Sequence, residues 1–113
     1  MSPKNVDIKE AIQLFFKNYV NFNGRSTRSE YWWAFLAYYV VYLVLNGIGM
    51  ATGLTFLALL FSLATFIPFI AVGIRRMHDI GKSGWFLLIP FYSLYLLAQP
   101  SDPNPNQYGD PAV

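Results

Sequence analysis

The segment RRMHDIGKSGW, residues 75–85, brings together side chains that could do chemistry. A histidine can act as a general acid or base, and arginines can hold a phosphate group through paired hydrogen bonds. His78 and Asp79 are therefore the candidate catalytic pair, with the neighbouring arginines as phosphate ligands.

The same segment also has a structural interpretation. Its GKS sequence is not a phosphate-binding loop, because that loop needs a glycine where this chain has Arg76. Nucleophilic catalysis would need a hydroxyl or thiol held against the histidine, and nothing in the local sequence requires one. On a helix, Asp79 is four residues from Arg75 and three from Arg76, so an ordinary surface ion pair would explain the aspartate. This spacing favours a helix end over a catalytic centre.

The composition is that of a membrane protein. Only 12 % of the residues are charged and 19 % are aromatic, whereas about a quarter are charged in ordinary soluble domains. Residues 31–74 contain no Asp, Glu, Lys, Arg or His, a longer run than the roughly 18 apolar residues that suggest a membrane span. The absence of cysteine and the single histidine argue against a metal site. We expect no cofactor and no nucleic-acid partner.

The apolar run is too long for one crossing. As a single helix, residues 31–74 would extend about 66 Å, twice the roughly 30 Å hydrocarbon core. The glycines within residues 46–55 predict a reversal there, which gives a first span at 27–48 and, at 54–80, a second span with its cytoplasmic extension. A shorter apolar stretch, residues 84–98, predicts a third span, with a re-entrant or interfacial segment as the alternative.

The flanking segments complete the predicted fold. Residues 5–22 place apolar side chains at spacings of three and four, which predicts an amphipathic helix on the bilayer surface or against its own bundle. Thr27 and Glu30 fit a capping box at the start of the first span. The proline-rich residues 99–113 predict an extended, exposed tail. We therefore expect a single all-α membrane domain, with three transmembrane helices preceded by an amphipathic interfacial helix.

The basic residues predict the orientation. Five precede the first span and three follow the second, whereas the first loop and the tail have none. Under the positive-inside rule the amino terminus is cytoplasmic, and the first loop and the tail lie outside. A collar of polar and basic residues should then face the cytoplasmic headgroups and bind lipid or a partner: Arg25, Arg28, Glu30, Arg75, Arg76, His78, Asp79, Lys82 and Trp85.

These features predict a non-enzymatic accessory protein that binds anionic lipid headgroups or a partner, which could be a larger membrane protein or a second copy. The charge-free stretch of residues 31–74, which forms the membrane-embedded part of the first two spans, contains no acidic, basic or histidine side chain, and this argues against a proton-coupled exporter. Two alternatives stay open: a small membrane enzyme that acts on a lipid headgroup with His78 and Asp79, and a subunit of a transporter.

Three blocks of sequence resemble a known family. GRSTRSEYWW, RRMHDIGKSGW and NPNQYGDP are similar to the motifs of the bacterial domain-of-unknown-function family 805, the YhaH/YhaI-like inner-membrane proteins. The matching positions are Gly24, Arg25, Arg28, Glu30, Tyr31, Trp32, Arg75, Arg76, His78, Asp79, Ser83, Gly84, Trp85, Asn106, Tyr108 and Gly109. The resemblance implies a multi-pass protein of the bacterial cytoplasmic membrane and implies no activity.

Overall fold

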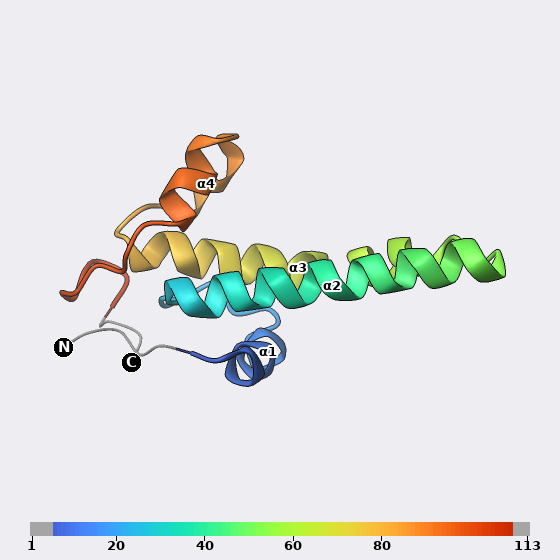
Figure 1. Ribbon diagram of the computed structural model, residues 1–113. Coiled ribbons are helices and arrows are strands. Elements are labelled where there is room, and N and C mark those ends of the chain that lie inside the picture. Colours follow the sequence, from blue (N-terminus) through green and yellow to red (C-terminus); the bar gives the residue numbers. More distant parts are fainter. Residues whose placement is uncertain (1–5, 110–113) are drawn as a thin grey trace.

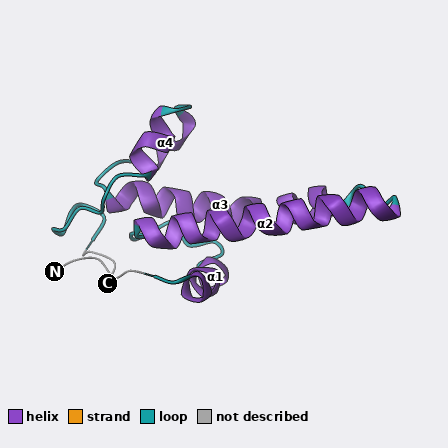
Figure 2. Ribbon diagram, viewed as in Figure 1, coloured by secondary structure: helices purple, strands orange, loops and turns teal. Residues whose placement is uncertain are grey.

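The computed structural model describes residues 6–109 as a long helical hairpin with smaller helical elements at one end (Figures 1 and 2). The elements in chain order are α1 (Ile8–Lys17), α2 (Arg28–Thr52), α3 (Leu57–Asp79), the 3-10 helix η1 (Gly84–Leu88) and α4 (Tyr92–Leu97). The described residues form no strand beyond one isolated bridge between Asn106 and Gly109. The all-α prediction is confirmed. Residue 5 of the predicted amphipathic helix and residues 110–113 of the predicted tail lie outside the described residues.

Helix α1 is shorter than the predicted segment. The Asp7 side chain caps its start by accepting a hydrogen bond from the amide of Glu10 at 2.8 Å. Ala11 and Phe15 are buried, while Phe16 is exposed on the same apolar side. The helix is therefore amphipathic, as predicted, and only part of its apolar face packs on the protein.

Helix α2 begins where the capping box predicted. The Thr27 side chain accepts a hydrogen bond from the Glu30 amide at 3.2 Å. The helix runs past the predicted end and stops at Gly53, whose φ of +81° favours glycine. Gly49 lies against the returning chain, since a Cβ there would sit 2.7 Å from the Leu54 carbonyl oxygen. Gly49 and Gly53 thus allow the chain to reverse direction between α2 and α3, as expected.

Helices α2 and α3 are both long and apolar enough to cross a membrane. Their 25 and 23 residues correspond to about 37 and 35 Å, against a hydrocarbon core of roughly 30 Å. Large apolar side chains such as Leu43 and Leu63 point outward along the hairpin. Such an apolar exterior is what a bilayer-facing pair of helices requires.

A third transmembrane helix is not confirmed. Residues 84–98 form η1, a bend and the six-residue helix α4, and six helical residues rise only about 9 Å. The bend has a local cause: Pro90 has no amide hydrogen and disfavours helix at the preceding residue. Phe91 follows with a φ of +65°, which an aromatic residue rarely adopts.

The tail returns to the end of the hairpin where α2 begins and α3 ends (Figure 1). The Arg25 guanidinium donates to the carbonyl of Asn104 at 2.9 Å, and the Asp102 amide donates to the carbonyl of Asp79 at 3.0 Å. The predicted tail therefore lies at the same end of the hairpin as the start of α2, and residues such as Asn104 and Gln107 are exposed, as expected. The tail packs here because buried arginines need carbonyl acceptors, and it supplies them.

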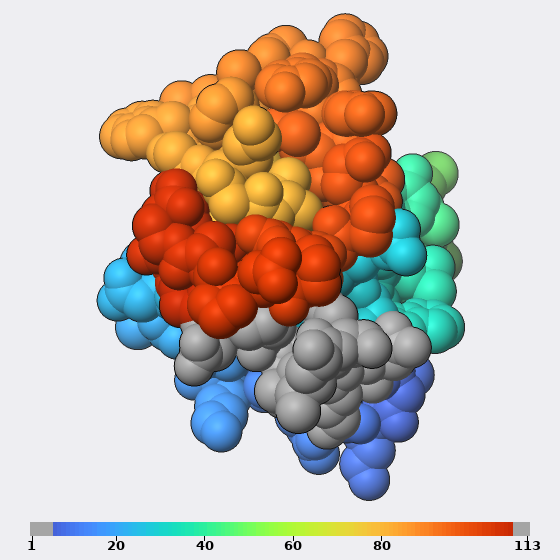
Figure 3. Space-filling view, turned by 90° about the vertical axis from the view of Figure 1, so that its left-hand side faces the viewer, coloured from blue at the N-terminus to red at the C-terminus, as the bar shows by residue number. Residues whose placement is uncertain are grey.

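The buried core lies at this same end of the hairpin. Seen along the hairpin from that end, α1 and the η1–α4 segment lie on opposite sides, and the tail crosses between them (Figure 3). Seven apolar side chains from α1 to α4 form the core: Phe15, Tyr31, Ala34, Val72, Met77, Leu96 and Leu97. Packing therefore fixes the elements that carry the candidate site.

Candidate functional site

Five charged side chains are buried together where α2 begins and α3 ends. Arg25 and Arg76 both pair with Asp79, each at 3.0 Å, and Arg75 pairs with Glu30 at 3.3 Å. All five are members of the predicted collar, and the structure brings them together. They lie inside the protein, however, and not on its surface. We call this set, Arg25, Glu30, Arg75, Arg76 and Asp79, the buried ion network.

The network has three positive groups and two negative ones, which leaves one positive charge in excess. Burial of a charge is costly unless the group is paired and hydrogen-bonded. In the described residues, each buried side-chain nitrogen and oxygen has a hydrogen-bond partner. Backbone carbonyls and the negative dipole end of α3 offset the excess, so the network is internally satisfied.

Arg25 holds the carboxyl-terminal tail. Its Nε donates to the Asp79 carboxylate, its Nη1 to the carbonyls of Asn104 and Gly109, and its Nη2 to those of Asp79 and Asp102. A guanidinium has five N–H donors, and these contacts account for all five. Arg25 therefore has no donor left for a phosphate.

Arg75 holds the segment between α1 and α2. Its Nη1 donates to the carbonyls of Asn18 at 3.2 Å and Asn21 at 2.7 Å, and its Nε donates to Ser26 Oγ at 2.9 Å. Ser26 Oγ in turn donates to Glu30 Oε2 at 3.0 Å. The Glu30 carboxylate of the predicted capping box thus accepts hydrogen bonds from Ser26 and Arg75.

Arg76 and Arg28 hold the end of α4. Arg76 donates from Nε to the carbonyl of Leu97 at 3.2 Å and from Nη2 to that of Gln99. Arg28, which is exposed, donates to the carbonyl of Ala98 at 3.1 Å. These donors cap carbonyls that a helix end leaves without partners. The four arginines therefore tie three parts of the backbone to the end of the hairpin: the tail, the segment between α1 and α2, and the end of α4.

His78 is half-buried and packs against the tail. Its Nδ1 donates to the carbonyl of Gly24 at 3.0 Å, and its ring stacks on Tyr108 with the centroids 3.9 Å apart. Asn106 donates to the His78 carbonyl at 3.0 Å. The carboxylate of Asp79 is engaged by two arginines. This geometry gives no support to a catalytic pair of His78 and Asp79.

The remaining predicted residues lie beside η1. The half-buried Lys82 places its ammonium 5.6 Å from the centre of the Phe86 ring. Ser83 caps η1 by accepting from the Trp85 amide at 3.3 Å. Trp85 itself is 78 % exposed. Across residues 6–109, no three His, Cys, Asp or Glu side chains are grouped so that they could hold a metal ion.

A polar cavity of about 460 Å³ opens between α1 and the segment that leads into α2. The buried ion network contributes part of its wall. Its lining residues are Val6, Glu10, Gln13, Leu14, Lys17, Asn18, Asn21, Asn23, Gly24, Arg25, Ser26, Thr27, Glu30 and Arg75. Sequence reasoning missed Lys17 and the asparagines as site residues. The polar face of α1 and the asparagine-rich stretch after it were the available signals.

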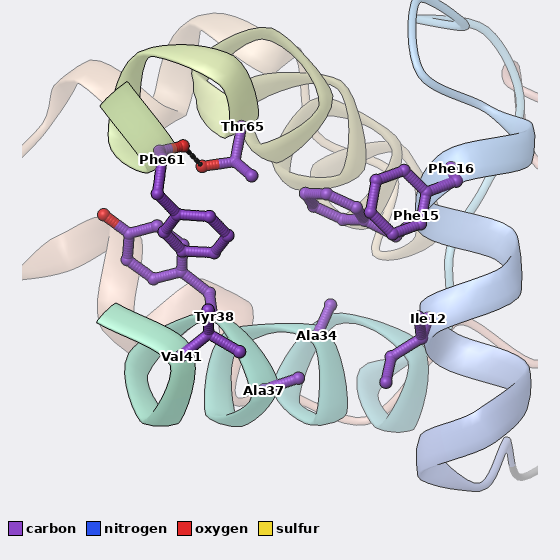
Figure 4. Close-up of a pocket in the computed structure, with 9 residues that line it drawn as sticks. All are labelled: Ile12, Phe15, Phe16, Ala34, Ala37, Tyr38, Val41, Phe61 and Thr65. Atoms are coloured by element: carbon purple, nitrogen blue, oxygen red, sulfur yellow. Dashed lines mark hydrogen bonds between the residues drawn. The ribbon is translucent and has the colours of Figure 1, made fainter. Parts of the chain in front are cut away.

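A second, smaller cavity is apolar and measures about 120 Å³ (Figure 4). Phe15 of α1 and Phe61 of α3 face it from opposite walls, and Ala34 and Ala37 of α2 form its floor. The small alanine side chains leave this space between the helices. It lies away from the buried ion network and has no charged lining residue.

The three sequence motifs meet at this end of the molecule. Gly24, with a φ of +88°, presents its carbonyl to His78. The Trp32 indole donates to the carbonyl of Leu97 at 3.0 Å. Gly84 fits where a Cβ would come within 2.9 Å of the Ile74 side chain. Most motif residues are thus explained by contacts within the protein, and Trp85 is the clear exception.

Comparison with known proteins agrees with this architecture. Inner membrane protein YhaI of Escherichia coli (strain K12) is 44 % identical over 86 residues, which cover 72 % of this chain and 73 % of that protein. Inner membrane protein YhaH of the same strain is 35 % identical over 111 residues, which cover 86 % of this chain and 92 % of that protein. No solved structure matches. Residues 19–110 match the family described as "Protein of unknown function (DUF805)", and the chain belongs to that family.

Proposed function

We propose that this protein is a non-enzymatic accessory protein of the bacterial cytoplasmic membrane that binds an anionic lipid headgroup in its polar cavity. The observation that carries the proposal is the position of this cavity of about 460 Å³, lined by Lys17, at the charged end of an apolar hairpin. In the described chain, all charged residues lie before residue 31 or after residue 74. This position supports binding at the headgroup level, where the charged ends of membrane helices lie.

The cavity residues divide between two tasks. Arg25 and Arg75 already donate to protein acceptors, so they shape the wall without needing a ligand. Lys17 is exposed on the last turn of α1, and its ammonium is a mobile point charge that can reach a phosphate. One basic residue at an anionic surface contributes about 1 kcal/mol. A selective but modest affinity is expected.

Lipid that co-purifies with the full chain tests this proposal. The variant Lys17→Gln should lose bound anionic phospholipid, measured by mass spectrometry after gentle extraction. Lys9→Gln is the matched control, because Lys9 is an exposed lysine on the same helix that does not line the cavity. Equal lipid in both variants and the parent would overturn the headgroup role. Retention of a larger membrane protein in place of lipid would instead support the accessory role through a protein partner.

We further infer that both described ends of the chain face the cytoplasm. The concentration of basic residues supports a cytoplasmic amino terminus, and the bonds from Arg25 to the tail support the same side for residues 102–109. The chain would then cross the membrane twice, with residues 84–98 remaining in one leaflet. A reporter fused after Val113 should be active only in its cytoplasmic form, and a periplasmic signal would contradict this topology.

A further inference from the structure

Helix α1 and the η1–α4 segment flank the charged end of the hairpin on opposite sides (Figures 1 and 3), and each has an exposed apolar surface. One is the outer face of α1 and the residues after it, and the other belongs to the η1–α4 segment. We call them the two wings. Their exposed apolar side chains include Ile8, Ile12, Phe16, Tyr19 and Val20 on the first wing, and Trp85, Leu88, Ile89, Phe91, Leu94 and Tyr95 on the second.

Both wings have packing contacts with the hairpin at a similar depth, and Tyr19 of the first wing also reaches deeper, to the Ala64 carbonyl. Phe15 of α1 and Ala34 of α2 share the buried core, and Ala34 lies six residues after the start of α2. Leu87 of η1 lies against Gly73, six residues before the end of α3. Six residues of helix rise about 9 Å. Interfacial helices lie about 5–10 Å into the boundary between headgroups and acyl chains, so both wings have the depth that such a position requires.

The other half of the hairpin has no such cover. Among residues 6–109, only α2 and α3 continue beyond the wings (Figure 1), and their exposed apolar side chains there include Met50 and Leu63. The molecule is therefore wider in the leaflet at its charged end than in the opposite leaflet.

We propose that the two wings insert into the headgroup boundary of one leaflet and make the protein favour membranes in which that leaflet is convex. Insertion of apolar side chains at this level is sensitive to curvature, because a convex leaflet offers more gaps between its headgroups. Trp85 supports the assignment of lipid as the occupant. It is a motif residue at 78 % exposure, and amphipathic indoles concentrate at the membrane interface.

The test is the distribution of the full chain between small and large vesicles of one lipid composition, labelled with different dyes. Insertion through the uncharged reversal at residues 53–56 leaves the charged end on the outer, convex leaflet. The parent protein should therefore be enriched per unit lipid area in the small vesicles. An even distribution of the parent protein would overturn the proposal.

Variants assign the effect to the wings. Trp85→Ser with Leu88→Ser should abolish the enrichment, whereas the matched control Met50→Ser with Leu63→Ser removes apolar groups of similar exposure from the bare hairpin and should retain it. Phe16→Ser with Val20→Ser repeats the test on the other wing if the first variant does not fold. Enrichment unchanged in a folded wing variant would contradict the assignment. Loss of lipid binding in Lys17→Gln alone leaves this prediction unaffected.

Discussion

The substitution Asp79→Asn is the most direct test of how much the buried ion network stabilises the fold. Asp79 is fully buried and accepts from Arg25 and Arg76, each at 3.0 Å. Asparagine has nearly the same shape but no charge, and its amide nitrogen would face a guanidinium donor. Removal of one partner from a buried ion pair costs about 3–5 kcal/mol, because the remaining charge stays buried without compensation. We expect a loss of unfolding free energy in that range.

Unfolding by sodium dodecyl sulfate in mixed micelles, followed by tryptophan fluorescence, measures this loss. Asp102→Asn is the control, because that carboxylate accepts only an exposed hydrogen bond from the Asn104 amide, and its loss should cost about 1 kcal/mol or less. The double variant Asp79→Asn with Arg76→Met removes one unpaired guanidinium. Its cost should be smaller than the sum of the two single costs. Equal costs for Asp79→Asn and Asp102→Asn would refute this reasoning.

Three further substitutions probe the packing of the hairpin and of its charged end. Gly84→Ala should destabilise the protein by about 1–3 kcal/mol in the same unfolding assay, because the new Cβ would come within 2.9 Å of Ile74. Gly47→Ala, which meets nothing within 4 Å, should instead stabilise α2 by about 0.5–1 kcal/mol; a loss at both positions would contradict the packing argument. Tyr108→Ala removes the stacked ring on His78, worth about 0.5–1.5 kcal/mol, and limited proteolysis of the tail should become faster. An unchanged cleavage rate would show that this stack does not hold the tail.

Much of the hairpin could be predicted from local sequence. The hydroxyl of Thr27 marks the helix start because capping is a property of neighbouring residues. The apolar run of residues 31–74 sets the length of the pair, and Gly53 sets its reversal through a positive φ. Pro90 argued against a continuous third helix, but the prediction gave more weight to the apolar residues around it.

The arrangement of the charged end could not be predicted in the same way. The right arginines were selected, but sequence does not show whether a basic residue at a helix end points outward or inward. Arg25 and Arg76 turn inward because carbonyls from residues 97–109 are available to them. Those acceptors are more than twenty residues away from either arginine along the chain, and no local pattern reports them.

The most direct test of the account is whether the tail lies against the end of α3 in the native membrane. The chain has no cysteine, so the pair His78→Cys and Tyr108→Cys can be introduced without background. Because the two native rings are stacked at 3.9 Å, oxidation in intact membranes should form an intramolecular disulfide. The pair His78→Cys and Gln107→Cys, with an exposed second position, should form it less readily. The account would be contradicted if the first pair formed no disulfide and its two thiols reacted with reagents added from opposite sides of the membrane.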